Sequence, residues 1–312
     1  MTTAKPERKP FDIIGAPFNQ LGFVPTDNNT VQPLREPDER CWLGLTEWIA
    51  VRNQRWGGDI RDMGDVLPDA RVRQHLHDGK KEQALAAYCQ LLHPQVLATY
   101  QQGRVPIILG GDHSITVGTL QATLDYFQPR NESVAVVWID AHADCNDSPA
   151  SNLHGKPLAM LMGEYCYNGW QVASDSLLKP ESVYYVGVRD LMPNEAALLE
   201  RHGITNYNME YIDRHGFRQM LSTLVEQLEI HYDRFFVSFD YDSLDGAIYR
   251  ACATPNVGGL TAREALTLVH TLAAHPKFVG MDLVEYLPEK DDNGVSKELM
   301  IKLIDAVWGF RM

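Results

Sequence analysis

The chain has 312 residues, of which 45% are hydrophobic and 22% charged, a composition typical of folded globular proteins and unlike that of disordered or fibrous ones. Its 41 acidic residues outnumber 28 basic ones, and the resulting net charge of -13 disfavours nucleic acid or an anionic membrane surface as a partner. The 5 cysteines form no CxxC pair, so we expect neither a disulfide framework nor a thiolate zinc site. Because we find no secretory signal and no apolar run long enough to span a membrane, we expect a cytoplasmic protein.

Short apolar segments recur along the chain, and each predicts a buried strand because it is nearly continuous and rich in β-branched residues. Helical patterns lie between these segments. In the first of them Pro94 predicts a kink or a new helix start, and at the start of another Thr261 and Glu264 have the spacing of a capping box. The predicted strands are 11–16, 105–109, 134–140, 182–188, 235–240 and 278–283, and the main helical patterns are 82–102, 217–228, 261–274 and 296–307.

Alternating strands and helices predict an α/β fold with a mainly parallel sheet that is covered by helices on both faces. No internal repeat or low-complexity linker divides the chain, so we expect a single domain over residues 1–312. Two segments lack the alternating pattern. We expect residues 1–10 to be flexible, and residues 19–68, with their Asn, Pro and Arg content, to form a long loop-rich excursion of the kind that makes lids or subunit contacts.

Acidic and imidazole side chains follow three of the predicted strands. The strand 105–109 is followed by GGDHS, 134–139 by DAHAD, and 235–239 by DYDSLD. Because ligands bind outside the carboxyl ends of the strands in an open parallel sheet, we expect these motifs to meet at one rim.

The DAHAD motif predicts a metal site. Asp140, His142 and Asp144 alternate with alanines, so in an extended chain they project to one side, as do Asp240 and Asp242 from another strand. Four adjacent carboxylates repel one another unless cations neutralise them. Carboxylates and imidazoles without thiolates suit Mn²⁺ and also Co²⁺, Ni²⁺, Fe²⁺ or Zn²⁺, and two such ions about 3.5–4 Å apart can activate a shared water. The pattern therefore predicts metal-assisted hydrolysis.

Each motif also has a structural interpretation. A single Asp at a strand end is often a turn or capping residue, and GGDHS alone could be a tight turn capped by Ser114. DAHAD is harder to explain in this way, because three ionisable groups are an unfavourable way to end a buried strand without a ligand. A binuclear phosphohydrolase would need a cationic phosphate clamp, and no Lys-bearing Gly loop or Arg cluster lies near the motifs.

Together, GGDHS, DAHAD, SFDYDSLD and MDLVEYLP resemble in order and spacing the signature segments of the ureohydrolases, the arginase and agmatinase superfamily. The resemblance extends from about residue 11 to the C-terminus. It implies a three-layer α/β/α fold around an eight-stranded mainly parallel sheet, a homotrimer or homohexamer, and two Mn²⁺ ions that serve to hydrolyse a guanidino substrate to urea and an amine. It implies His113, Asp140, Asp144 and Asp240 as ligands of one ion, and Asp140, His142, Asp240 and Asp242 as ligands of the other.

The resemblance also implies roles in catalysis and substrate binding. His154, in SNLHG, matches a histidine that passes a proton to the leaving amine, and Glu285 matches the acid that holds the guanidinium. With Asp144, they are the expected catalytic groups. The expected substrate-binding residues are Asn146, Asn152, Glu195, Thr254 and Glu285.

Two positions depart from the arginase pattern and keep the substrate open. Met192 stands where arginases carry an acid for the α-ammonium group, and Ala150 stands where they carry a serine, for which Ser148 or Ser151 could substitute. SNLHG favours L-arginine and disfavours formiminoglutamate, whereas Met192 keeps agmatine, guanidinobutyrate or another guanidine as alternatives. A noncatalytic regulatory subunit is the alternative from another class, and the complete set of metal ligands argues against it.

Overall fold

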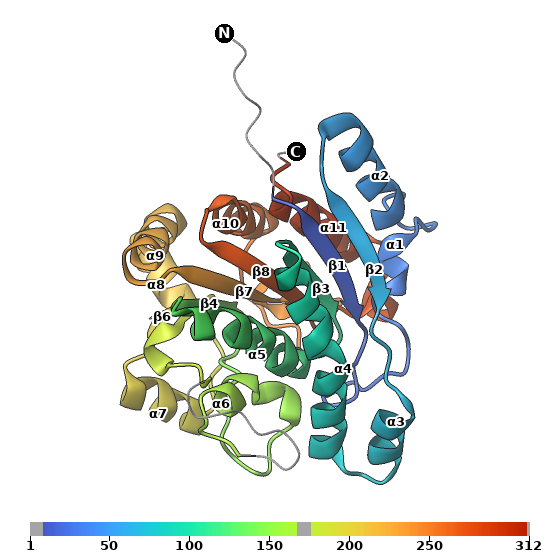
Figure 1. Cartoon of the computed structure of the whole chain (residues 1–312). Coiled ribbons are helices and arrows are strands. Elements are labelled where there is room, and N and C mark those ends of the chain that lie inside the picture. Colours follow the sequence, from blue (N-terminus) through green and yellow to red (C-terminus); the bar gives the residue numbers. More distant parts are fainter. Residues whose placement is uncertain (1–8, 167–175, 311–312) are drawn as a thin grey trace.

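The computed structural model describes residues 9–166 and 176–310 (Figure 1). Within them, eight strands form one sheet in the order β2-β1-β3-β8-β7-β4-β5-β6, and all the neighbouring strands run parallel. The strands are β1 (Phe11–Ala16), β2 (Ile60–Asp65), β3 (Val105–Gly110), β4 (Val134–Ile139), β5 (Val183–Val186), β6 (Thr205–Tyr207), β7 (Arg234–Asp240) and β8 (Phe278–Val284).

Helices cover both faces of this sheet, which confirms the expected three-layer α/β/α fold (Figure 1). The chain alternates between strands and helices along most of its length, and parallel neighbours require such crossovers. The α-helices are α1 (Gln32–Arg35), α2 (Leu45–Trp56), α3 (Ala70–His77), α4 (Lys81–Gln101), α5 (Thr116–Phe127), α6 (Pro157–Leu161), α7 (Pro193–His202), α8 (Met209–His215), α9 (Phe217–His231), α10 (Ala262–Ala274) and α11 (Val295–Val307).

The central strands are buried on both sides, which explains their continuous apolar sequences. In β4, Val137 and Ile139 face the core beneath α10 and α11, while Val136 and Trp138 face the core beneath α4 and α5. Alternate residues of a strand point to opposite faces, so a strand covered on both sides needs apolar residues at every position.

Two helices test the predictions made from local sequence. The capping box of α10 is confirmed, because the Thr261 hydroxyl accepts a hydrogen bond from the Glu264 amide (3.3 Å) and Glu264 Oε2 accepts one from the Thr261 amide (2.9 Å). In contrast, α4 continues through Pro94 as one helix, so no new helix starts there.

The expectation of a loop-rich excursion over residues 19–68 is wrong for its second half. This part contains the 12-residue helix α2 and the strand β2, which pairs with β1 at the edge of the sheet. In β2 only Ile60 is buried, so the strand has no apolar run that marks it in the sequence. Of the N-terminal segment expected to be flexible, residues 1–8 lie outside the described residues.

All five cysteines are free thiols, and Cys166 is the exposed one. Among the described residues, no helix combines the length and the apolar character that a membrane crossing needs.

Candidate metal centre

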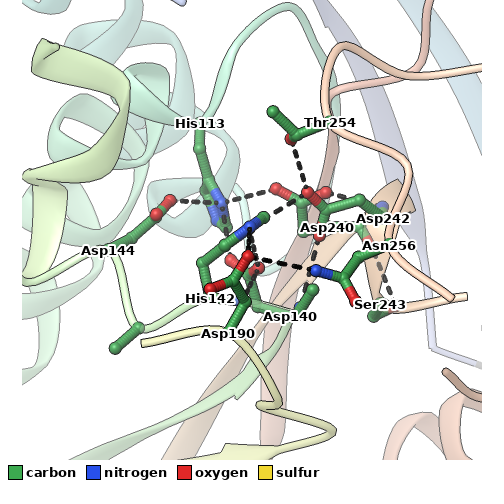
Figure 2. A network of polar contacts seen from close by, with 12 residues as sticks. His113, Asp140, His142, Asp144, Asp190, Asp240, Asp242, Ser243, Thr254 and Asn256 are labelled. Atoms are coloured by element: carbon green, nitrogen blue, oxygen red, sulfur yellow. Dashed lines mark hydrogen bonds and ion pairs between the residues drawn. The ribbon is translucent and has the colours of Figure 1, made fainter. Parts of the chain in front are cut away.

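The carboxyl ends of the four central strands bring the acidic motifs together. The strands β3, β8, β7 and β4 are neighbours in the sheet, and GGDHS follows β3, DAHAD follows β4 and DYDSLD extends from β7. Glu285 directly follows β8. The side chains of the three motifs converge in a single cluster, as Figure 2 shows.

The first group consists of His113, Asp140, Asp144 and Asp240, all of them buried. His113 Nδ1 lies 3.1 Å from Asp140 Oδ2, 2.9 Å from Asp144 Oδ2 and 2.9 Å from Asp240 Oδ2. One ligand atom from each residue lies within 4.8 Å of the others, so the four atoms could surround one cation.

The second group consists of Asp140, His142 and Asp242. His142 Nδ1 lies 3.5 Å from Asp140 Oδ1 and 3.1 Å from Asp242 Oδ2. Asp140 therefore presents one oxygen to each group, as a bridging carboxylate does. Asp240, the second expected bridge, falls in the first group only, and its Oδ1 accepts a hydrogen bond from the Asp242 amide (2.7 Å).

The chemistry of the first group fits a cation. His113 Nδ1 is buried and, although three carboxylates surround it, makes no hydrogen bond with any of the described residues. Nitrogen and carboxylate donors suit divalent ions such as Mn²⁺ or Zn²⁺. An ion at the centre of this group would satisfy that nitrogen and neutralise the acids around it.

The electrostatics of the cluster also favour a bound cation. Burial and then the neighbouring carboxylates Asp242 and Asp140 raise the pKa of Asp240 well above its usual range. Burial and Asp140 likewise raise the pKa of Asp144 and that of Asp242. A raised pKa means that the protein disfavours the ionised carboxylate, and a nearby cation removes that penalty.

A chain of hydrogen bonds behind His113 selects its tautomer. His113 Nε2 lies 2.8 Å from Ser238 Oγ, which donates to Asp282 Oδ1 at 2.6 Å. Thr116 and Thr119 donate to the other oxygen of Asp282, which is fully buried. Since the Ser238 hydroxyl proton goes to Asp282, its oxygen accepts the proton on Nε2, which leaves Nδ1 as the nitrogen that an ion in the first group would bind.

Trp138, which lies on β4, contacts two of the expected metal ligands, His113 and Asp140. Its indole ring stacks on His113 at 4.1 Å, and its Nε1 donates to Asp140 Oδ2 at 2.9 Å. Sequence analysis did not single out Trp138, Ser238 or Asp282 as functional residues. Ser238 and Asp282 are polar residues inside otherwise apolar strands, where they pair across β7 and β8. Such a position in a buried strand is itself the signal that could have found them.

His154 and Glu285 form a buried ion pair beside the first group. His154 Nδ1 lies 3.1 Å from Glu285 Oε1, which also accepts a hydrogen bond from the His113 amide at 3.0 Å. Burial opposes a charge on His154, but the hydrogen bond and charge of Glu285 prevail and raise its pKa to about 9. The Glu285 carboxylate therefore favours the protonated form of His154.

Two of the acids adopt a backbone conformation that favours glycine. Asp144 has a φ of 47° and Glu285 a φ of 64°, in the left-handed region. A non-glycine residue there costs about 1–3 kcal/mol, and such strain persists only where the surrounding structure imposes it. The Glu285 amide, which donates to the carbonyl of Gly111 at 2.8 Å, is part of what holds it in place.

A cavity of about 510 Å³ opens beside the cluster. It brings together the expected substrate-binding residues Asn146, Asn152, Glu195 and Thr254, while Glu285 does not line it and contacts His154 instead. Four of its lining residues were not expected from the sequence. The wall consists of Phe23, His142, Asp144, Asn146, Ala150, Ser151, Asn152, His154, Gly155, Asp190, Met192, Glu195, Thr254, Pro255 and Asn256, of which Phe23, Asp190, Pro255 and Asn256 are the unexpected four.

Phe23 reaches the cavity from the first half of the 19–68 segment. The backbone amide of Leu21 donates to Asp112 Oδ2 at 2.8 Å, which fixes the loop against the GGDHS motif. The Phe23 ring then meets the His154 ring edge to face at 5.2 Å, while 64% of Phe23 stays exposed. A loop remote in sequence from the motifs thus forms part of the cavity wall.

Asp190 and Asn256 lie on the side of the second group. Asp190 Oδ2 lies 3.9 Å from His142 Nε2 and accepts a hydrogen bond from Asn256 Nδ2 at 3.2 Å (Figure 2). The neighbouring Arg189 donates to the carbonyls of Asp242 (2.8 Å) and Asn256 (2.7 Å) and so ties the turn after β7 to the 254–257 wall. Arg189 and Asp190 belong to the VGVRD sequence, which begins at the last residue of β5.

Glu195 and Met192 differ sharply in their surroundings. Glu195 is 5% exposed, and its Oε2 accepts a hydrogen bond from the Met192 amide at 3.0 Å, which caps α7. Burial raises the pKa of Glu195 to about 7. Met192 is 58% exposed and lines the cavity. One oxygen of Glu195 is therefore used to cap α7, and the apolar side chain of Met192 lies nearby.

Comparisons with known proteins agree with this geometry. The family model described as the arginase family matches residues 11–309. An arginase of Coccidioides posadasii (strain C735) is 37% identical over 301 residues, which cover 90% of this chain and 90% of that protein. An arginase of Bacillus caldovelox is 31% identical over 311 residues, which cover 97% of this chain and 99% of that protein.

Solved structures give the same answer for the fold. The native structure of the Bacillus caldovelox arginase matches with a TM-score of 0.81 at 29% identity and covers 97% of this chain and 99% of its own. The arginase from Bacillus cereus matches with a TM-score of 0.81 at 27% identity and covers 98% of this chain and 100% of its own. The match thus extends over the sheet as well as the acidic rim, and the chain belongs to the arginase family.

Proposed function

We propose that this arginase-like, metal-dependent amidinohydrolase acts on L-arginine and releases urea and ornithine, with two Mn²⁺ ions held by the six expected ligands. The observation that carries the proposal is the pair of ligand groups that share Asp140 beside a cavity of about 510 Å³. Arginases at 37% and 31% identity support L-arginine as the substrate.

The metal ligands and the ion pair divide the chemistry between them. Divalent ions held by these ligands would lower the pKa of a bound water and so supply a hydroxide nucleophile at neutral pH. We assign to Glu285, which contacts His154 and does not line the cavity in this structure, the carboxylate that would pair with the planar guanidinium through parallel hydrogen bonds. His154, whose protonated form the Glu285 carboxylate favours, donates a proton to the leaving amine from the ring nitrogen not paired with Glu285.

The other end of the substrate contacts the outer wall. In this proposal Asn146 and Asn152 bind the α-carboxylate side, and Glu195 meets the α-ammonium group when its carboxylate is ionised. Thr254 donates to Asp242 Oδ2 at 2.9 Å, and this contact orients a ligand of the second group beside the substrate.

Met192 favours a second candidate, a guanidino compound without an α-ammonium group. Its exposed side chain lies on the cavity wall close to Glu195, one oxygen of which caps α7. An ammonium group against an apolar wall would lose its solvation without a full ionic partner. Guanidinobutyrate, or another guanidine without an ammonium group, would avoid that penalty.

Urea release from L-arginine, agmatine, guanidinobutyrate and free guanidine, each with Mn²⁺, Co²⁺ and Ni²⁺, tests the proposal. We expect the highest kcat/KM for L-arginine with Mn²⁺, and about two metal ions per chain by elemental analysis. A preference for agmatine or guanidinobutyrate would refute L-arginine as the substrate, and a preference for guanidinobutyrate over both amines would support the second candidate. A metal-loaded protein that releases no urea would support the regulatory-subunit alternative.

We also propose a homotrimer or homohexamer in the cytoplasm. Large apolar side chains such as Trp42 (74% exposed) and Ile248 (65% exposed) are available for contacts between copies. Free thiols suit a reducing compartment. Light scattering at several concentrations measures the assembly, and fractionation of the source cells measures its location.

A further inference from the structure

Lys156 is a buried lysine that the proposed chemistry does not use. It lies two residues after His154, and its side chain is 0% exposed. Its Nζ donates to the backbone carbonyls of Asn146 (3.3 Å) and Ser148, and it lies 4.2 Å from the centre of the Tyr165 ring. Among the ion pairs of the described residues, none includes Lys156. Carbonyl dipoles and an aromatic face therefore compensate its charge.

Lys156 joins two segments that both line the active-site cavity. The Asn146 amide donates to the carbonyl of Gly155 (3.0 Å), and the Leu158 amide donates to the carbonyl of Asp144 (3.0 Å). The 144–148 segment therefore lies beside the 155–158 segment, and the ammonium group adds two hydrogen bonds at the open end of this pairing. Beyond Ser148 the loop continues to Asn152, on the cavity wall.

The anchored carbonyls determine how Asn146 is presented. Its Oδ1 accepts hydrogen bonds from Asn194 Nδ2 (2.8 Å) and from the Ser148 amide (3.0 Å). Because the carbonyls on both sides of this turn are held by Lys156, the backbone cannot rotate without breaking those bonds. A methionine would fill the same space without desolvating a charge, so what only the ammonium group supplies is the two hydrogen bonds.

We propose that Lys156 is a positioning residue, which fixes the 146–152 loop so that Asn146 and Asn152 bind the end of the substrate remote from the guanidinium. This inference rests on the proposed function for the identity of that end. It assigns to Lys156 a role in substrate affinity and none in metal binding or in the chemical step, because its contacts are to backbone carbonyls and an aromatic ring.

The test is Lys156→Met in the Mn²⁺-loaded full chain, with the exposed Lys179→Met as the matched control. We expect KM for L-arginine to rise about tenfold or more, as for the loss of a charged hydrogen-bond contact, with kcat changed less than about threefold. The metal content should stay at the wild-type value. Lys156→Gln, which keeps one amide donor, should give a smaller rise in KM and serves if the methionine variant does not fold.

Hydrogen exchange measured by mass spectrometry gives a readout that does not depend on the substrate. We expect peptides covering 146–152 to exchange faster in Lys156→Met than in the wild type, and peptides of the central strands to be unchanged. Unchanged exchange in this loop would overturn the inference, and so would faster exchange with an unchanged KM. If the wild type does not act on L-arginine, the proposed function fails. The role of Lys156 is then still decided by hydrogen exchange in the 146–152 loop, together with KM for the substrate that the wild type does hydrolyse.

Discussion

The floor and the mouth of the active-site cavity are built differently. On the floor, His113 and Asp140 are completely buried at strand ends, and each contacts several other polar side chains. At the mouth, Phe23 and Met192 lie on loops with more than half of their surface exposed. Every metal ligand implied by the family resemblance is present on the floor, whereas Met192 and Ala150 depart from it at the mouth.

The difference has a physical origin. Strands paired on both sides can force like charges together, because the sheet resists the movement that would separate them. Loops at the mouth carry no such constraint, so their side chains can change without disturbing the sheet. Floor residues should therefore control metal binding and kcat, and mouth residues should control KM.

The largest effect is expected for Asp140→Asn, because Asp140 contributes an oxygen to both ligand groups. We expect the variant to lose at least one metal ion. Its kcat should fall by more than roughly 100-fold, which is the upper end of the range seen when a residue that only hydrogen-bonds to a metal ligand is replaced. Elemental analysis and urea release measure both effects. The exposed Asp213→Asn is the control, and an active variant with two ions would contradict the bridging role.

His154→Ala should lower kcat by roughly 10²–10⁴-fold, the range for loss of a positioned general acid. The metal content should not change, because the ring contacts Glu285 and not the ligand groups. Steady-state kinetics with elemental analysis separates the two effects, and His231→Ala on the surface is the control. A rate equal to that of the wild type would exclude proton transfer by His154.

Ser238→Ala should weaken the first metal site by roughly 10–100-fold, since it breaks the chain from Asp282 to His113. Titration against a chelator measures this affinity directly. KM measured at saturating metal should stay close to the wild-type value, because Ser238 lies beneath the floor. If the metal affinity matches that of the exposed control Ser222→Ala, the hydrogen-bond chain does not orient His113.

The smallest effect is the pH dependence of KM at the mouth. Burial raises the pKa of Glu195 to about 7, so the carboxylate is mostly protonated below pH 7 and ionised above it. KM for L-arginine should therefore fall as the pH rises from about 6 to 8, where the ionised fraction grows from about one tenth to nine tenths. Glu195→Gln should remove this dependence. A substrate without an α-ammonium group should show none in either protein.

The inner strands were predictable from sequence, but the edge strands were not. The six inner strands of the sheet, from β1 through β5 in the sheet order, appear in the sequence as apolar runs, because each is covered on both faces. The two edge strands, β2 and β6, are short or mostly exposed and need no such run. Burial generates the pattern, and where burial is partial the pattern disappears.

The floor of the site follows from the order of residues alone, because alternating acids after a buried strand share one side and parallel strands end at one rim. The remaining contacts depend on how the chain folds. The tertiary structure aligned Ser238 with Asp282 across two strands, brought Phe23 against His154 from a remote loop, and buried Lys156 beneath the carbonyls of the cavity wall. These contacts join residues far apart in the chain or depend on the conformation of a loop. Neither can be predicted from the local pattern of apolar and polar residues.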